Sequence, residues 1–396
     1  MSRYFRLVAL TKSQVNERFY DTVGGRIVFE TEAQGYLHPY AVAKLLAAQA
    51  RERGVRELKL LELGANDCAF GTSLLKLLTT LTIHGEVALE RIDYFAVELA
   101  RRSLEAFLGT EDAAAFQRVV PGTGGSPLVG TLTRLGVPQV NLHLVHSEAG
   151  AFVSGGSGRY DAVVVNELLD DLPSRTFYAD AEGKAYEFAA QAHEEDGGWR
   201  VEVSASPAAG VELPPSTLTA TSGASLAIVR GAASLLASGG MLLVHDYGFV
   251  ERWTPVSWYE ALPRSLPEWV TLDFPPGSES GFPRSFFRIF GSDEARVLQI
   301  TADVAFAELI DELRPGGPVI TLPHGNALIK SRERQDDLRK GDGVFLSEFA
   351  LLEPGDDLGT LLARLDAEQD ALRRRFADEF LGGNATVFAD LLHVKS

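Results

Sequence analysis

The chain has 396 residues, 45% of them hydrophobic, so it can bury the core of one large domain or of two smaller ones. Its formal net charge of -17 argues against nucleic acid or an anionic membrane surface as a partner, because lysine and arginine must neutralise such polyanions. A single cysteine, Cys68, excludes an internal disulfide and a metal site built from several cysteines. We expect a globular, cytoplasmic protein.

The N-terminal region predicts a helix and no targeting segment. The first twenty residues carry charges throughout and lack a long apolar core, so neither a secretory signal nor an anchor is expected there. No segment approaches the roughly 20 apolar residues that a membrane helix requires. At 38–53, Val42, Leu45 and Leu46 have helical spacing and Gly54 ends the pattern, which predicts an amphipathic helix.

A series of apolar or β-branched runs follows, with helical patterns at 72–81 and 225–240 between some of them. Such runs alternating with helices indicate a parallel sheet covered on both faces. The expected strands are 58–64, 92–99, 140–148, 160–169 and 241–249. The predicted fold class is therefore α/β with a Rossmann-like sheet.

Two regions depart from this alternation. Residues 174–206 contain strand-like pieces joined by Glu-Gly and Asp-Gly-Gly turn signals, which predicts an antiparallel hairpin inserted in or appended to the sheet. Later in the chain, 300–313 reads as a short strand into a helix, and 356–376 as an amphipathic helix that suits either a homodimer contact or packing on its own chain. We expect three regions: an N-terminal lid with lead-in helices at 1–55, a cofactor-binding core at 56–250, and a C-terminal substrate, cap or oligomerisation region at 251–396.

The ends of the predicted strands carry polar residues that suit a ligand. In an open parallel sheet, ligands bind beyond the carboxyl ends of the strands. The stretch GANDCAFG after the first strand lacks the G-x-G-x-x-G pattern of dinucleotide sites. It follows an acid, Glu62, and a second acid, Glu98, closes the next strand, where a carboxylate can accept hydrogen bonds from both hydroxyls of a ribose.

These two acids suit S-adenosylmethionine, which carries a ribose and two cationic groups but no phosphate. The alternative is that Glu62 and Glu98 only cap strand ends. The residues expected to contact this cofactor are Glu62, Gly64, Asn66, Gly71, Glu98, Ser147 and Asn166.

The stretch NELLDDLPSRTF at 166–177 resembles the N/H-E-x-x-D-x-L-P-x-x-x-F signature of the MidA-like methyltransferases. That family includes a mitochondrial complex I assembly factor that methylates protein arginine. FETEAQGYLHPYAVAKLL, LLELGAN, LLVHDYGF and ITADVAFAELID follow in the family's order, so the resemblance covers roughly residues 20–315. The family usually has E-L-G-P-G-x-G-x-L where this chain has a different loop after Gly64. The resemblance implies a class I methyltransferase sheet and S-adenosylmethionine as the cofactor.

The resemblance also implies arginine as the methyl acceptor. The altered loop after Gly64 and the arginines near 284 slightly favour free arginine or a small guanidine over a protein arginine. A guanidinium is protonated at neutral pH and has to approach another cation, so carboxylates are needed to bind it and to offset the repulsion. Glu167 and Asp170 lie three residues apart after a strand end, where a first helical turn would place them on one face. They are the expected clamp, with Asp171 stabilising the helix N-terminus.

Further residues complete the expected site. Asp246 and Tyr247 match the family's D-Y-G strand and are expected to line the same site, Asp246 as a catalytic residue and Tyr247 in contact with the substrate. His245 is expected to point to the opposite face. His38 is either a proton acceptor or a structural turn residue. Arg284, and with it Arg288, is a candidate for binding a substrate carboxylate.

Two other functions stay open. A small-molecule O-methyltransferase would use a base such as His38 and would not depend on Glu167. A binding or assembly protein would keep the methyltransferase fold without catalysis. Cys68 is expected to be a buried filler, and no histidine or acid cluster has metal-ligand spacing along the sequence, so no metal site is expected.

Overall fold

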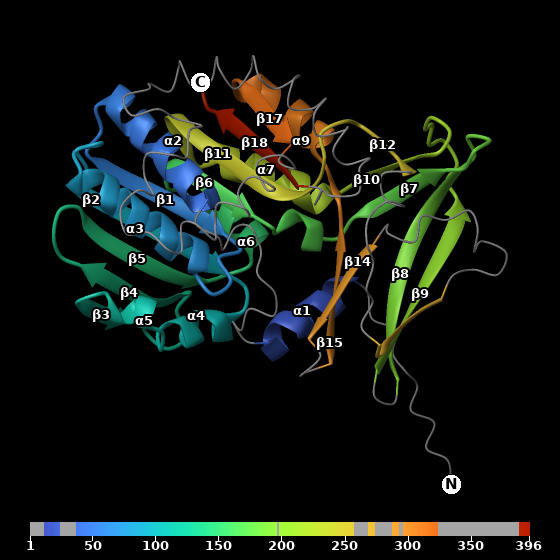
Figure 1. The fold of residues 1–396 in the computed structure, drawn as a ribbon, viewed down its shortest axis with the longest axis horizontal. Coiled ribbons are helices and arrows are strands. Elements are labelled where there is room, and N and C mark those ends of the chain that lie inside the picture. Colours follow the sequence, from blue (N-terminus) through green and yellow to red (C-terminus); the bar gives the residue numbers. More distant parts are fainter. Residues whose placement is uncertain are drawn as a thin grey trace, which may run out of the picture.

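A mostly parallel sheet forms the centre of the molecule (Figure 1). The structure, a computed structural model, describes residues 12–23, 37–195, 198–256, 268–273, 287–292, 296–323 and 388–396. Across the central sheet the strand order is β17-β18-β11-β6-β1-β2-β5-β4-β3, and β16 pairs with β11. The strands are β1 (Glu57–Leu63), β2 (Arg91–Glu98), β3 (Arg118–Pro121), β4 (Leu128–Arg134), β5 (Gln139–His146), β6 (Tyr160–Asn166), β11 (Leu236–Phe249), β16 (Val304–Ala305), β17 (Val319–Pro323) and β18 (Phe388–Val394).

The middle of this sheet is parallel and its two sides are antiparallel. β5, β2, β1, β6 and β11 run parallel to one another. On one side β4 is antiparallel to β5, and on the other β18 lies antiparallel between β11 and β17. With helices on both faces, this is a Rossmann-like α/β sheet, so the predicted fold class is confirmed. β17 and β18 come from 251–396, the region expected to form a cap, and they instead complete the central sheet.

Helices cover both faces of the sheet. One face packs against α2 (Leu37–Arg53), α3 (Ala69–Ile83), α4 (Arg101–Phe107) and α5 (Glu111–Ala114), the other against α6 (Ala149–Gly155), α7 (Gly223–Ser234) and α9 (Phe306–Leu313). Leu58 and Leu60 of β1 belong to the first core, and Leu61 and Leu63 to the second. Strand alternation therefore explains why β1 is apolar on both faces.

Two predicted helices differ in detail from the structure. α2 is not amphipathic, because residues 42–50 are all buried, including Lys44 and Gln49. Lys44 lies 3.7 Å from Glu86, and this ion pair offsets the cost of burying the ammonium. The predicted helix at 225–240 is too long, since α7 ends at Ser234 and β11 begins at Leu236.

A second sheet projects from the central one (Figure 1). Its order is β12-β10-β7-β8-β9-β13, built from β7 (Arg175–Ala179), β8 (Ala185–Glu195), β9 (Gly198–Pro207), β10 (Thr217–Thr221), β12 (Thr254–Pro255) and β13 (Val270–Asp273). β8 and β9 are the predicted antiparallel hairpin. α1 (Lys12–Val23) packs against β15 (Val297–Ala302), which pairs with β14 (Phe287–Ser292). The predicted helix at 356–376 lies outside the described residues.

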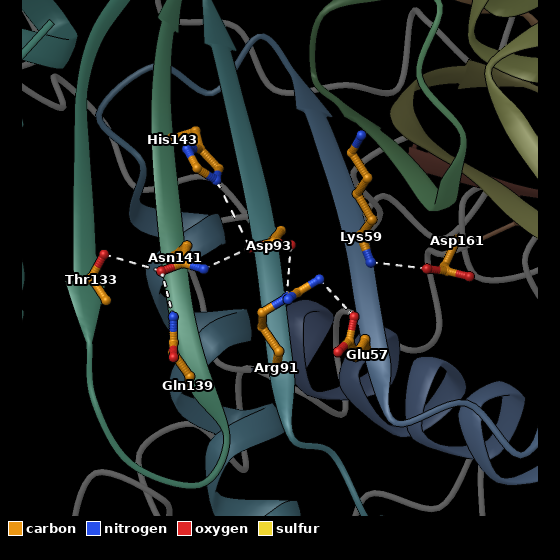
Figure 2. Close-up of polar contacts among 9 residues, drawn as sticks. All are labelled: Glu57, Lys59, Arg91, Asp93, Thr133, Gln139, Asn141, His143 and Asp161. Atoms are coloured by element: carbon orange, nitrogen blue, oxygen red, sulfur yellow. Dashed lines mark hydrogen bonds and ion pairs between the residues drawn. The ribbon is translucent and has the colours of Figure 1, made fainter.

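Polar side chains cover part of the central sheet toward the amino ends of its strands. Figure 2 shows Arg91 between Glu57 and Asp93, at 2.6 and 3.1 Å, and Asn141 donating to Asp93 at 2.7 Å. His143 lies 4.0 Å from the same carboxylate. This polar network is at the end of the strands opposite to the candidate site.

Of the helices in the described ranges, none has the length and apolarity needed to cross a membrane.

Candidate functional site

The candidate site lies where the strand order of the central sheet reverses. β1 pairs with β2 on one side and with β6 on the other, so the carboxyl ends of β1 and β6 flank this switch point. The loops that follow the two strands touch: a Cβ added at Gly64 would lie 3.2 Å from the side chain of Leu168. Gly64 also has a φ of +78°, which favours glycine. The fold thus joins the loop at 64–68 to the loop at 167–171.

The loop after β1 is fastened to the end of β2. The N–H groups of Gly64 and Ala65 both donate to the Val97 carbonyl, at 2.9 and 3.1 Å. Asn66 adopts a left-handed φ of 45°, and its N–H donates to Glu98 at 2.8 Å. These N–H groups are therefore occupied, and they do not form an open cradle for a pyrophosphate.

An acid occupies the helix end that dinucleotide-binding proteins use for phosphate. Asp67 lies just before α3, and its Oδ1 accepts from the Ala69 N–H at 3.1 Å. A carboxylate here adds negative charge where a helix N-terminus would otherwise attract an anion. The start of α3 therefore disfavours a phosphate-bearing cofactor.

Glu98 is buried and holds two backbone groups. Its Oε2 accepts from the Asn66 N–H and its Oε1 from the Ala100 N–H, at 2.8 and 2.7 Å. Burial raises the pKa of Glu98, and these backbone hydrogen bonds lower it. A carboxylate offers about four lone-pair positions, so the two oxygens can also accept from the hydroxyls of a diol.

Glu62 and Gly71 pack against each other beneath α3. Tyr94 donates to Glu62 Oε2 at 2.7 Å, and burial raises the pKa of Glu62 to about 8. A Cβ at Gly71 would lie 2.8 Å from the Tyr94 ring and 3.0 Å from the Glu62 carboxyl. Glu62 therefore packs beneath α3 in a hydrogen bond with Tyr94, and its expected contact with the cofactor stays a prediction. Gly71 is required for close packing, because there is no room for a side chain.

The loop after β6 begins with two predicted site residues. Asn166 ends the strand, and Glu167, which is half-buried, has a left-handed φ of 46°. A single turn of 3-10 helix, η1 (Leu169–Asp171), starts only two residues later, and Asp170 within it is buried. The α-helical turn that was expected to contain both Glu167 and Asp170 is therefore absent, because Glu167 has a left-handed backbone and η1 begins only at Leu169.

Asp246 fixes the loop at 167–171 through backbone hydrogen bonds. Its side chain is fully buried, and its oxygens accept from the N–H groups of Leu169, Asp170 and Tyr247 at 2.7, 3.4 and 2.8 Å. Burial raises the pKa of Asp246 to about 7. We expected a catalytic residue that lines the site, and the structure instead gives Asp246 a positioning role under η1. Tyr247 is half-buried.

Asp171 joins the same loop to two distant elements. It accepts from Asn16 and Tyr20 of α1, at 2.8 and 2.5 Å, and from Gln299 of β15 at 3.0 Å. The sequence predicted an acid at a helix N-terminus, and no sequence signal indicates these partners. Asn16 also exchanges two hydrogen bonds with the backbone of Ile300. Asp171 therefore anchors α1 beside the candidate site.

Two histidines and an aspartate from three different elements form a cluster next to Asn166. His38 Nε2 is 3.0 Å from Asn166 Oδ1, and the His38 ring stacks on His245 with centroids 4.1 Å apart. His245 Nδ1 is 2.7 Å from Asp390 Oδ1 on β18. His245 and Asp246 point to opposite faces of β11, as strand alternation predicted. Within the described residues, Asn166 Nδ2 is buried without a hydrogen-bond partner.

The other predicted residues are placed as follows. Ser147 is half-buried after β5, and its N–H donates to the Glu98 carbonyl at 3.0 Å. Cys68 is a buried free thiol, and burial raises its pKa. Arg284 lies outside the described residues. Arg288 pairs with Thr301 in the β14–β15 register, and its side chain lies outside the description.

Comparisons with known proteins give distant structural similarity. Neither protein-family models nor curated proteins match the sequence. One similar structure is a Burkholderia thailandensis protein bound to S-adenosyl-homocysteine, with 17% identity, a TM-score of 0.49, and coverage of 98% of this chain and 88% of that one. The glycopeptide N-methyltransferase MtfA, complexed with sinefungin, has 14% identity, a TM-score of 0.34, and coverage of 73% and 86%.

The [4+2]-cyclase SpnF is also similar, with 12% identity, a TM-score of 0.37, and coverage of 98% of both chains. Identities and TM-scores this low do not assign an activity to this chain. The assignment has to come from the residues at the switch point.

Proposed function

We propose that this chain is an S-adenosylmethionine-dependent methyltransferase that acts on a guanidino group. The observation that carries the proposal is the meeting of two acidic loops, 64–68 and 167–171, at the switch point of the sheet. One loop provides features that suit a phosphate-free nucleoside, and the other provides carboxylates that suit a cationic acceptor.

The cofactor side of the proposal rests on Glu98 and Asp67. Glu98 is fixed by two backbone N–H groups, so its orientation is set before a ligand arrives, and its remaining lone pairs suit the two hydroxyls of a ribose. Asp67 at the start of α3 opposes a phosphate and favours a ligand with positive charge. S-adenosylmethionine meets both conditions, and when bound it supplies an electrophilic methyl group on sulfur.

The acceptor side rests on Glu167 and Asp170. A guanidinium binds carboxylates through paired N–H groups, and nearby carboxylates offset its repulsion from a sulfonium. Bound S-adenosylmethionine would supply the methyl group for a new N–C bond and would keep the electrons of the broken C–S bond on sulfur, and the acceptor nitrogen would release its proton to water. In this mechanism Glu167 and Asp170 orient the acceptor, while Asp246 holds their loop in place. The loop after Gly64 that departs from the family pattern, and Arg284 as a candidate for binding a substrate carboxylate, favour free arginine or a small guanidine over a protein arginine.

A hydroxyl acceptor is the second candidate, and the position of His38 favours it. His38 is buried beside Asn166 at the end of β6, where a histidine can take a proton from a hydroxyl. The two candidates differ in the effect of Glu167→Gln: a guanidino acceptor predicts a loss of most of the rate, and a hydroxyl acceptor predicts that much of it remains.

Calorimetric titration with S-adenosylhomocysteine tests the cofactor side. We expect binding by the wild type and at least about tenfold weaker binding by Glu98→Gln, because the variant loses charge-assisted hydrogen bonds. Glu57→Gln is the matched control, since Glu57 lies at the far end of the adjacent strand (Figure 2). The absence of binding by the wild type would overturn the proposal and favour a non-catalytic role.

Mass spectrometry tests the acceptor side in the same preparation. Incubation with S-adenosylmethionine and free arginine should add about 14 daltons to arginine, for one methyl group in place of a hydrogen. Cofactor binding without methylation of free arginine, of small guanidines or of peptide arginine would rule out a guanidino acceptor.

A further inference from the structure

Three metal-ligating side chains from distant parts of the chain gather beside the candidate site. They are His38 of α2, His245 of β11 and Asp390 of β18, and one ligand atom from each lies within 4.8 Å of the other two. Both histidines are buried, and the side chain of Asp390 is 25% exposed. We propose that these residues bind one divalent transition-metal ion, with Zn²⁺ as the best match to the donor set.

The choice of metal follows from the donor atoms. Two imidazoles with one carboxylate suit Zn²⁺ and its first-row neighbours, whereas Mg²⁺ and Ca²⁺ prefer oxygen ligands alone. Ligand atoms around a tetrahedral ion with bonds of about 2.1 Å lie roughly 3.4 Å apart. The present spread of up to 4.8 Å therefore closes with side-chain movements on the order of 1 Å.

The hydrogen bonds around the three residues are those expected of a metal site without its ion, in which a proton lies between two of the ligands. His245 Nδ1 and Asp390 Oδ1 share a proton at 2.7 Å, and an ion that binds both residues releases that proton. Metal-binding histidines commonly use their second nitrogen in a hydrogen bond that fixes the ring. The 3.0 Å contact between His38 Nε2 and Asn166 Oδ1 is of this kind.

The backbone also favours a fixed site. His245 and Asp390 are direct partners in the β11–β18 register, and the same residue of β11 pairs with Asn166 on β6. Two of the three ligands are therefore set by adjacent strands, and only His38 comes from a helix. Three protein ligands leave a fourth coordination position of a tetrahedral ion for water or a ligand. The proposed metal site is independent of the proposed methyltransferase function.

Direct metal titration of the full chain tests the proposal. Metal-stripped protein is titrated with Zn²⁺ by calorimetry and with Co²⁺ by absorbance, and the melting temperature is measured with and without Zn²⁺. We expect one ion per chain and a raised melting temperature, because the ion binds only the folded state. His38→Gln and Asp390→Asn should each weaken binding at least about tenfold. His143→Gln is the matched control, a histidine stacked on Phe95 away from the site.

The outcomes separate clearly. Loss of binding in His38→Gln and Asp390→Asn, with His143→Gln unchanged, supports the site. Wild-type protein without stoichiometric binding, or equal binding by all three variants, overturns it, and the second result would indicate adsorption to the acidic surface. If the two ligand variants do not fold, the wild-type Co²⁺ spectrum decides: strong bands of a four-coordinate ion support the site, and the weak spectrum of the hydrated ion overturns it.

Discussion

Replacing Glu62 with glutamine should stabilise the protein at neutral pH. Burial raises the pKa of Glu62 from 4.5 to about 8, although the hydrogen bond from Tyr94 acts in the opposite direction. Above about pH 4.5 the unfolded chain releases this proton while the folded protein keeps it. The stability that this group contributes is therefore complete below about pH 4.5 and is lost as the pH rises toward 8. At about 1.4 kcal/mol per pH unit, the loss by pH 7 is on the order of 3 kcal/mol.

Urea unfolding of the wild type and Glu62→Gln between about pH 5 and about pH 8 measures this effect. A glutamine stays neutral and can still accept from Tyr94, so the variant avoids the loss. We expect the stability difference in favour of the variant to grow with pH by about 1.4 kcal/mol per unit and to level off near pH 8. Glu105→Gln, at an exposed ion pair on α4, is the control and should follow the wild type.

Two results would refute the reasoning. One is a difference between wild type and Glu62→Gln that does not change with pH. The other is a wild type that is the more stable protein at pH 7 to 8, which would mean that Glu62 is stabilised as a carboxylate in the folded state.

Two further substitutions test how the loops are held. Gly71→Ala should cost about 1–3 kcal/mol of unfolding free energy, because its Cβ would lie 2.8 Å from the Tyr94 ring; Gly124→Ala, with open space around it, is the control, and equal urea midpoints would contradict the packing. Asp171→Asn should loosen α1 by about 2 kcal/mol, because a neutral group replaces the acceptor of Tyr20, and protection of 12–23 from hydrogen exchange should fall. Unchanged protection of 12–23 would show that α1 is held by other contacts.

The parallel core was predictable because its signal is local. β1, β2, β6 and the end of β11 are mostly apolar, since both faces of a central strand are covered, and β5 alternates apolar with polar residues. The short strands were not predictable, because they lack this local signal. β3 is exposed at every position and β17 has five residues, so neither gives a long apolar pattern. β18 is separated from its partner β11 by about 145 residues along the chain.

The candidate site was predictable as a set of strand ends but not as a set of roles. An acid after an apolar run identifies Glu98 and Glu167 in the sequence. The sequence does not reveal that Asp246 accepts hydrogen bonds from the backbone of η1, or that Glu62 accepts a hydrogen bond from Tyr94 beneath α3. Whether a carboxylate is free to bind a ligand depends on what the rest of the fold places against it.

By itself, the sequence determined the α/β class, the order of the central strands along the chain and the acids at their carboxyl ends, because strand periodicity and burial are written in neighbouring residues. The tertiary structure decided which of these acids support the backbone, which elements Asp171 anchors, and that His38, His245 and Asp390 meet. The contacts of Asp171 and those among the three metal-ligating residues join segments more than a hundred residues apart, and Asp246 contacts a loop 77 residues away in the sequence. Only the folding of the sheet brings such segments within hydrogen-bonding distance.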